Sequence, residues 1–316
     1  MKYAIYPEAT IVATASSSDA AYPVTNLTAD KYRKKIWKAN ATNVATLRCA
    51  ITGISELITL HGTNAIEAVC TITLNSAEKA FRVSDAVDVG GGLVKLPVTD
   101  HGMVMGDVVL INGTTNYDGV HILPSQAAGD AINLIITAAY VAETFAITDT
   151  ACKIIETTTH DLDTATQTYD RFWQEYTEQT NAHTATIKLT AAVGVTVEAG
   201  KVVAGALVEF ANPSYTPKKV PKSYAVIKEL RNGARWGNAG EVVRSFSYDM
   251  RMIHAKAEDL DDLYHAVDPD PIAMLITSGW DDNLWCVYGL ILDPGPNISY
   301  INARHAIVGV SILESV

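Results

Sequence analysis

The sequence is poor in charge, and positive charge in particular is scarce. Charged residues make up 19% of its 316 positions, and 24 Lys and Arg residues stand against 35 Asp and Glu residues, giving a formal net charge of −11. The one basic run, Lys31–Lys35, is short and is interpreted as a solvated loop. Because an acidic surface repels phosphate backbones, we predict that the protein does not bind nucleic acid.

Paired cysteines and long apolar runs are also missing. The four cysteines, Cys49, Cys70, Cys152 and Cys286, lie far apart in apolar, strand-like settings, with no CxxC pair. This pattern predicts free, buried thiols in a protein that assembles in a reducing cytoplasm. No run of about 18 apolar residues occurs, and the first residues, MKYAIYPEAT, lack the apolar stretch of a signal peptide. We therefore expect neither membrane insertion nor a secretion signal.

Motifs of catalysis and metal binding are absent as well. There is no HExxH, nucleophile elbow or dinucleotide fingerprint, and Gly90–Gly92 lacks the GK[ST] of a phosphate-binding loop. The oxygen-rich segments His160–Asp163 and Asp281–Asn283 lack the spacing of a calcium loop and are interpreted as polar loops. We predict a non-catalytic protein without metal or cofactor. An enzyme that acts on polysaccharide through two distant carboxylates stays an open alternative.

What the sequence does contain is apolar, strand-forming material. Hydrophobic residues make up 48% of the chain, which is enough for real cores, and the heavy use of Thr and Val favours strands. Alternating or short apolar segments between turn residues predict individual strands. These are Thr10–Thr14, Ala45–Ile51, Glu56–His61, Ala68–Leu74, Ala131–Ala138, Ala185–Leu189, Val242–Met252, Leu284–Leu292 and His305–Leu313.

The spacing of these segments predicts an all-β protein with three units. Residues 77–152 carry closely spaced Gly-containing turns, typical of a small antiparallel barrel, and the pattern after them resumes the one before. We therefore predict a jelly-roll β-sandwich from residues 1–76 and 153–210, with a small β-barrel inserted at 77–152. After a linker at 212–217, residues 218–316 are expected to form a β-rich domain with one helix at Lys256–Val267, where apolar residues fall on one stripe.

Several aromatic residues stand beside Gly, Asn or Ser rather than inside apolar runs. Tyr22, Trp37 and Trp173 could offer exposed ring faces to a sugar. The alternative is that each tryptophan plugs a loop against a sandwich core, and Phe172 with Trp173 is expected to pin a loop in this way. Trp236 and Trp280 belong to the same group of isolated aromatics.

Several segments of the sequence resemble known proteins. Ala13–Ser17, Tyr22–Thr28 and Trp37–Ala39 are similar to the opening of discoidin-type (coagulation factor 5/8 C-terminal-like) jelly rolls of phage virion proteins, and Val197–Gly205 is similar to their closing strand. The turn motifs Gly106–Val109 and Tyr117–Gly119 resemble a barrel inserted in phage structural proteins. The C-terminal motifs resemble phage tail proteins: Glu229–Trp236, Val243–Tyr248 and Asn283–Gly289. The calcium- and lipid-binding loops and the paired terminal cysteines of eukaryotic discoidin domains are not found here.

This resemblance implies a structural subunit of a phage virion tail, such as a distal-tail, tail-tip or adaptor-like ring component assembled in the host bacterial cytoplasm. Its partners would be further copies of itself, in a ring-forming homo-oligomer, and other virion tail proteins. We expect an exposed apolar assembly surface within residues 218–316, at Trp236, Leu260, Leu263, Tyr264 and Trp280. The alternative function is a carbohydrate-binding module that recognises a host surface glycan.

Overall fold

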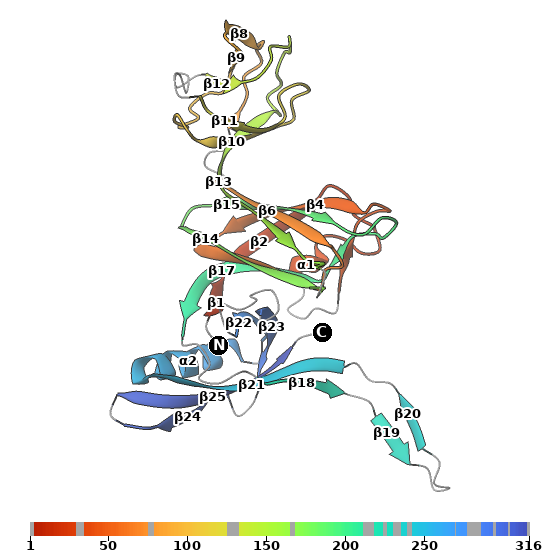
Figure 1. Cartoon of the computed structure of the whole chain (residues 1–316), viewed down its shortest axis with the longest axis vertical. Coiled ribbons are helices and arrows are strands. Elements are labelled where there is room, and N and C mark those ends of the chain that lie inside the picture. Colours follow the sequence, from red (N-terminus) through yellow and green to blue (C-terminus); the bar gives the residue numbers. More distant parts are fainter. Residues whose placement is uncertain are drawn as a thin grey trace.

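The computed structural model describes most of the chain, and every structural statement below concerns those residues. They are residues 3–29, 35–74, 79–124, 133–164, 168–210, 218–223, 226–229, 235–238, 242–268, 270–276, 286–292, 295–302 and 304–314. They are mainly antiparallel strands, so the prediction of an all-β protein is confirmed. Figure 1 shows an elongated molecule with a small unit of short strands at the top, a sandwich in the middle and a sheet with a helix at the base.

Two facing sheets form the central sandwich. Alternation of apolar and polar residues, clearest in β4, places one side of each strand in a shared core that includes Leu47, Ile58, Ile187 and Val202. The first sheet contains β2 (Thr10–Ala15), β4 (Val44–Thr52), β15 (His183–Thr190), β6 (Glu67–Leu74) and β13 (Thr150–Asp161). The second contains β14 (Arg171–Gln179), β5 (Ser55–His61), β17 (Lys201–Glu209) and β1 (Tyr3–Glu8). Helix α1 (Asn26–Ala29) and the pair β3 (Trp37–Lys38) and β16 (Glu198–Ala199) close the edges.

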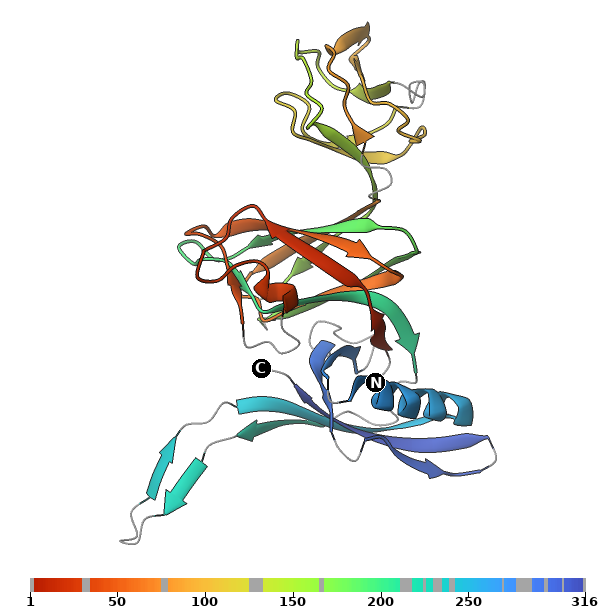
Figure 2. The same cartoon turned by 180° about the vertical axis from the view of Figure 1, so that it is seen from behind.

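The unit at the top has a core of its own, built from residues between Phe81 and Ala151. Strand β13 runs out of it into the sandwich: its first residues pair with β10, and the rest pair with β6. One sheet is therefore continuous through the junction (Figure 2). The other strands of this unit are β7 (Lys79–Ala80), β8 (Val87–Gly90), β9 (Leu93–Leu96), β10 (Val108–Asn112), β11 (Gly119–Ile122) and β12 (Leu134–Thr137).

The base is a sheet covered on one side by helix α2 (His254–Val267). The helix starts two residues before the predicted Lys256, and its buried residues include the predicted Ala257, Leu260, Leu263 and Val267. The strands of the base are β18 (Lys218–Ser223), β21 (Val242–Ile253), β22 (Ile272–Leu275), β23 (Cys286–Ile291), β24 (Asn297–Tyr300) and β25 (His305–Glu314). Strands β19 (Val226–Glu229) and β20 (Arg235–Asn238) form a separate hairpin. The predicted linker 212–217 lies outside the described residues.

The sandwich and the base share one ten-stranded sheet, which sequence patterning does not indicate. Strand β1 pairs with β17 of the sandwich on one side and with β22 of the base on the other. A further apolar cluster, with Ile5, Trp173, Leu275 and Tyr288, packs at this junction. The expectation that Phe172 and Trp173 pin a loop is wrong, because both lie in strand β14. Phe172 faces the sandwich core and Trp173 faces the junction, since this part of the sheet is buried on both faces.

One half-buried and one buried histidine in the sandwich, His160 and His183, make its stability depend on pH. His160 stacks on Phe172 with ring centroids 4.6 Å apart, and Nε2 of His183 lies 2.9 Å from the Tyr176 hydroxyl. Burial lowers the pKa of both imidazoles below the ordinary value of 6.5. It outweighs the opposite effect of the hydrogen bonds that they donate to Gln174 and to the Asn181 carbonyl. The unfolded chain therefore binds more protons than the folded one as pH falls below 6.5, and stability is lost in that direction.

We expect urea unfolding to show a free energy that decreases from pH 7 to pH 5, and a smaller decrease in His160→Gln. The glutamine keeps a polar contact to Gln174 but cannot be protonated. Equal slopes in the parent and in His160→Gln would show that His160 does not contribute.

Candidate assembly surface

The β19–β20 hairpin stands apart from the rest of the molecule. Its strands pair only with each other in the described structure, from Val226 opposite Asn238 to Glu229 opposite Arg235, and they form a sheet of their own. Figure 1 shows the hairpin projecting away from the base, beyond the end of β18 and β21. An isolated two-stranded hairpin is marginally stable in water, so this segment gains stability when another surface covers it. We call strands β18, β19 and β20 together the arm.

The arm begins with an open sheet edge. Strand β18 pairs with β21 from Lys218 opposite Ser247 to Ser223 opposite Val242, and it is the last strand of the ten-stranded sheet. Its other edge presents backbone donors and acceptors that no described strand pairs with. Such edges are templates for strand addition by another chain, and lysines are residues that natural proteins place on them.

On the opposite side of the base, helix α2 separates an apolar from an acidic face. Its inner face packs on the sheet core through Ala257, Leu260, Leu263, Tyr264 and Val267. Ile253, the N-cap residue of α2, makes no side-chain cap, and the acidic residues that the sequence places in the first turns begin only at the fifth helical residue. They therefore act as an exposed charged face rather than as partners of the helix N-terminus.

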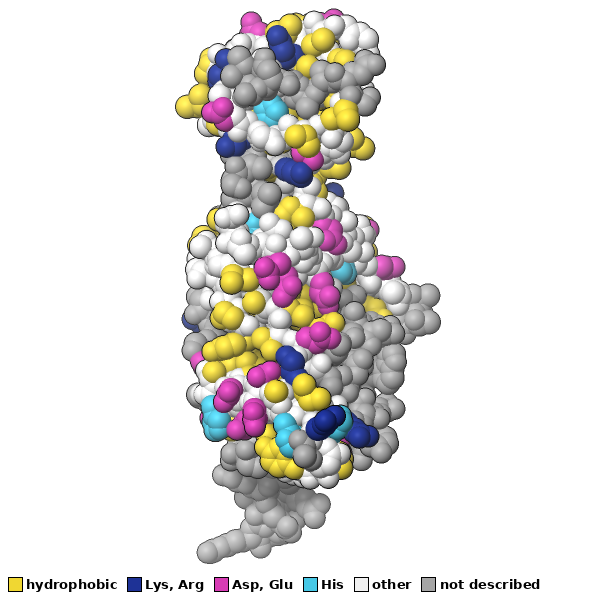
Figure 3. Space-filling view, turned by 90° about the vertical axis from the view of Figure 1, so that its left-hand side faces the viewer, with side chains coloured by type: hydrophobic (Ala, Val, Ile, Leu, Met, Phe, Trp, Pro, Cys, Tyr) yellow, Lys and Arg dark blue, Asp and Glu magenta, His cyan; other side chains and the backbone are white. Residues whose placement is uncertain are grey.

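The outer face of α2 carries mostly carboxylates. Glu258, Asp259 and Asp262 are exposed and Asp261 is half-buried. Only two basic groups of the helix pair with them: Lys256 Nζ lies 3.4 Å from Asp259 Oδ2, and His265 Nε2 lies 3.8 Å from Asp261 Oδ2. Figure 3 looks onto this side and shows Asp and Glu side chains gathered over the lower part of the described body, with basic side chains at its lower edge.

Exposed apolar side chains flank the start of this helix. Ile253 precedes it, and Tyr300 and Ile301 lie at the tip of the β24–β25 hairpin, where the His254 amide donates to the Arg304 carbonyl. Tyr300 is 60% exposed and stacks edge-on against His254, with ring centroids 4.6 Å apart. Apolar groups beside a charged face are typical of protein interfaces, which have an apolar centre and a polar rim.

A cavity of about 190 Å³ lies at the other end of α2. Its wall holds the carboxylates of Glu8 and Asp270 and the rings of Tyr6 and Tyr288. Lys201 is 6% exposed, and its Nζ lies 5.7 Å from the Tyr288 ring centroid. The cavity lies at the C-terminal end of α2, where the peptide dipoles favour positive charge.

We call the outer side of α2, its apolar flank and this cavity the helix surface. It comprises Ile253, Glu258, Asp259, Asp261, Asp262, Tyr300 and Ile301, together with Glu8 and Asp270 at the cavity.

The aromatic residues predicted for glycan contact do not form a site. The expectation that Trp37 and Trp173 present ring faces is wrong: Trp37 is fully buried in the sandwich core and Trp173 is 5% exposed in the junction cluster. Trp173 Nε1 donates to Glu175 Oε1 at 3.0 Å. Tyr22 is 40% exposed, and Lys38 Nζ lies 4.9 Å from its ring centroid. Of the three residues predicted for glycan contact, Tyr22 is thus the one with an accessible ring.

The apolar residues predicted for assembly are also placed differently. Leu260, Leu263 and Tyr264 are buried between α2 and its own sheet, so the expectation that they face a neighbour is wrong. Amphipathic spacing identifies the inner side of a helix, and here the chain itself covers that side. The side chain of Trp236 and the whole of Trp280 lie outside the described residues.

The sequence interpretation missed the cavity residues Glu8, Lys201, Asp270 and Tyr288, because they come from four distant segments. The negative charge of residues 254–270 could have indicated the acidic outer face of α2. Within the described ranges, no three His, Cys, Asp or Glu side chains are grouped to hold a metal ion. In the same ranges, no helix has the length and apolar character needed to cross a membrane. The segment 281–283 lies outside these ranges.

The comparisons with known proteins identify no family for this chain. No family model matches the sequence, and no curated protein or solved structure is significantly similar to the chain.

Proposed function

We propose that this protein is a structural subunit that assembles with copies of itself into a ring, as a distal-tail, tail-tip or adaptor-like component of a phage virion tail. The observation that carries the proposal is the β19–β20 hairpin, which stands apart as a two-stranded sheet. A segment of this kind has no core of its own, and burial against another subunit would supply one.

The arrangement of the base supports a head-to-tail contact. The arm projects from one side, and α2 lies on the other side in both Figure 1 and Figure 2. Two different surfaces on opposite sides generate a heterologous interface, which closes into a ring when the rotation between subunits allows it. The assignment to a phage tail rests on the resemblance of the opening, barrel and C-terminal motifs, and other tail proteins would be its further partners.

Removal of the hairpin tests this proposal. Ser223 and Val242 are paired across β18 and β21, so an Asn-Gly turn can replace residues 224–241 and join the two strands directly. We expect the complete chain to sediment as a discrete oligomer of the 34.0 kDa subunit, and the shortened variant to sediment as a monomer. Unchanged circular dichroism and melting temperature of the variant would confirm that it is folded. A complete chain that stays monomeric at high concentration would refute the proposal, as would a shortened variant that assembles equally well.

A further inference from the structure

The distribution of charge along the chain is strongly uneven. Strands β18, β19 and β20, the arm, contain five Lys and Arg residues and one Glu, a formal charge of +4 in a chain whose net charge is −11. Residues 254–270, which form α2 and one side of the cavity, contain six Asp and Glu residues and one Lys, a formal charge of −5. Two regions of opposite charge thus lie within about the last third of the sequence.

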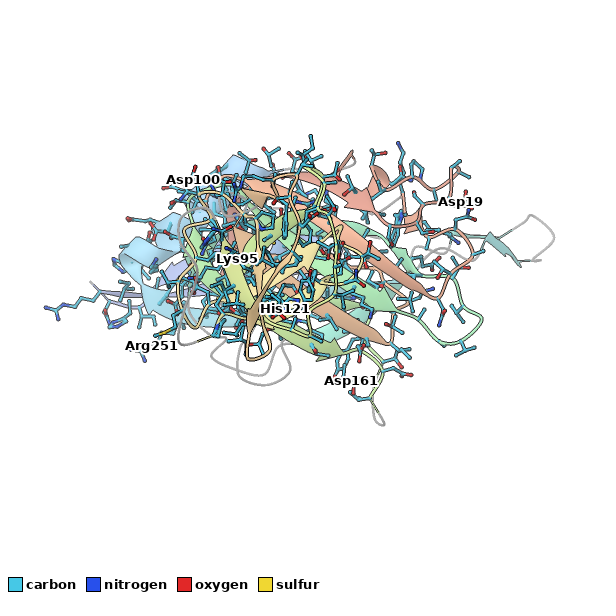
Figure 4. The ribbon with its side chains drawn as sticks, turned by 90° about the horizontal axis from the view of Figure 1, so that it is seen from above. Asp19, Lys95, Asp100, His121, Asp161 and Arg251 are labelled. Atoms are coloured by element: carbon cyan, nitrogen blue, oxygen red, sulfur yellow. The ribbon has the colours of Figure 1, made fainter. Side chains whose placement is uncertain are left out.

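These two segments do not meet within one copy. Seen from above, α2 and the hairpin lie at opposite sides of the molecule, with the labelled Arg251 on the side of the helix (Figure 4). Their separation in Figures 1 and 2 agrees with this view. The backbone of the hairpin therefore lies away from α2 inside a subunit, and a contact between the two oppositely charged elements is one between subunits.

We infer that the basic arm of one copy docks on the acidic helix surface of the next copy. This inference rests on the proposed function and names the partner surface of the same assembly. The two sides have matching chemistry. The helix surface offers exposed carboxylates and exposed apolar side chains, and the arm sequence combines Lys228 and Arg235 with Val226 and Ile227.

Each contact leaves one arm and one helix surface free at the ends of a growing chain of subunits. Identical contacts then repeat until the last arm reaches the first helix, which closes a ring. Complementary charge also orients the encounter and disfavours arm-to-arm or helix-to-helix pairing, because like charges repel. Since exposed charges are screened by salt, the association should weaken as ionic strength rises.

Charge reversal tests the inference in the full chain. Glu258→Lys with Asp262→Lys changes two exposed carboxylates one turn apart on α2, and Lys228→Glu with Arg235→Glu changes the arm. We expect each double variant to raise the dissociation constant for assembly at least tenfold in sedimentation at low salt. A 1:1 mixture should assemble again, because each reversed surface then meets a complementary one on the other variant. The quadruple variant should also assemble.

A matched control separates specific contacts from a general change in charge. Glu67→Lys with Glu178→Lys adds the same charge at exposed positions of the sandwich and should assemble like the parent protein. If the parent assembles but neither reversal weakens it more than this control, the inference is wrong while the proposed function stands. Variants that stay apart when mixed would also overturn the inference. A parent protein that does not assemble at all would remove the proposed function itself.

Discussion

Replacement of Arg171 by methionine is expected to lower the free energy of unfolding by about 3–5 kcal/mol, because it leaves buried acceptors and a buried carboxylate without their cation. Arg171 is 1% exposed at the start of β14. Its Nη1 lies 2.6 Å from Glu314 Oε1 and donates to the Cys286 carbonyl at 2.9 Å, and its Nη2 lies 2.6 Å from Asp170 Oδ1. One side chain thus joins the sandwich to strands β23 and β25 of the base.

The electrostatic surroundings indicate that this guanidinium stays charged. Burial alone lowers the pKa of Arg171, but the charges of Glu314 and Asp170 outweigh that effect and the pKa is raised above its ordinary value. Glu314 is 5% exposed, so water does not replace the lost partner in the variant.

A double-mutant cycle measures the coupling between the two residues. Glu314→Gln in the Arg171→Met background should cost less than in the parent, since the carboxylate no longer has its partner. The half-buried pair Lys38–Glu198, at 3.1 Å, is the control, and Glu198→Gln should cost much less than Arg171→Met because water screens this pair. A loss below about 1 kcal/mol for Arg171→Met in chemical denaturation would show that this ion pair does not hold the two parts together.

Replacement of Trp37 by alanine is expected to destabilise the protein by about 3–5 kcal/mol, through lost apolar burial and the cavity that remains. Trp37 is the largest of the fully buried side chains and packs in the sandwich core with Leu27 and Val197. Tyr22→Ala in the same segment is the control, and it should cost less than about 1 kcal/mol because this ring is accessible and contacts Lys38.

The same pair of variants tests the alternative of a carbohydrate-binding module. Sugar titration followed by tryptophan fluorescence should give no saturable signal in the parent protein. If a sugar does bind, and Trp37→Ala abolishes that binding while its unfolding free energy stays close to that of the parent, Trp37 is a ligand contact and its assignment to the core is wrong.

Strands that bury one face could be predicted from the sequence. The alternation in β4, β6, β21 and β25 shows which residues face a core, and each of these strands lies within one or two residues of its predicted range. Strand β14 could not be predicted, because both of its faces are covered and its sequence, Arg-Phe-Trp-Gln, therefore does not alternate. Nor does any local pattern show that β1 joins the sandwich to the base. This depends on the pairing of β1 with β17 and β22, which lie about two hundred or more residues further along the chain.

The candidate site was predictable only in part. The apolar stripe of α2 was found correctly, but the sequence does not show whether a stripe is covered by its own chain or by a neighbour. The acidic outer face of α2 and the basic arm can be recognised in the sequence from their clusters of charged residues. Their placement on opposite sides of the base arises from the fold, and that placement turns two charged segments into candidate partners.

Electron cryo-microscopy of the purified full-length chain at low salt tests the central claim most directly. We expect closed rings with rotational symmetry, in which density for the arm of each subunit crosses onto helix α2 of its neighbour. Single asymmetric subunits at all concentrations would contradict it, and so would two-fold dimers in which arms contact arms.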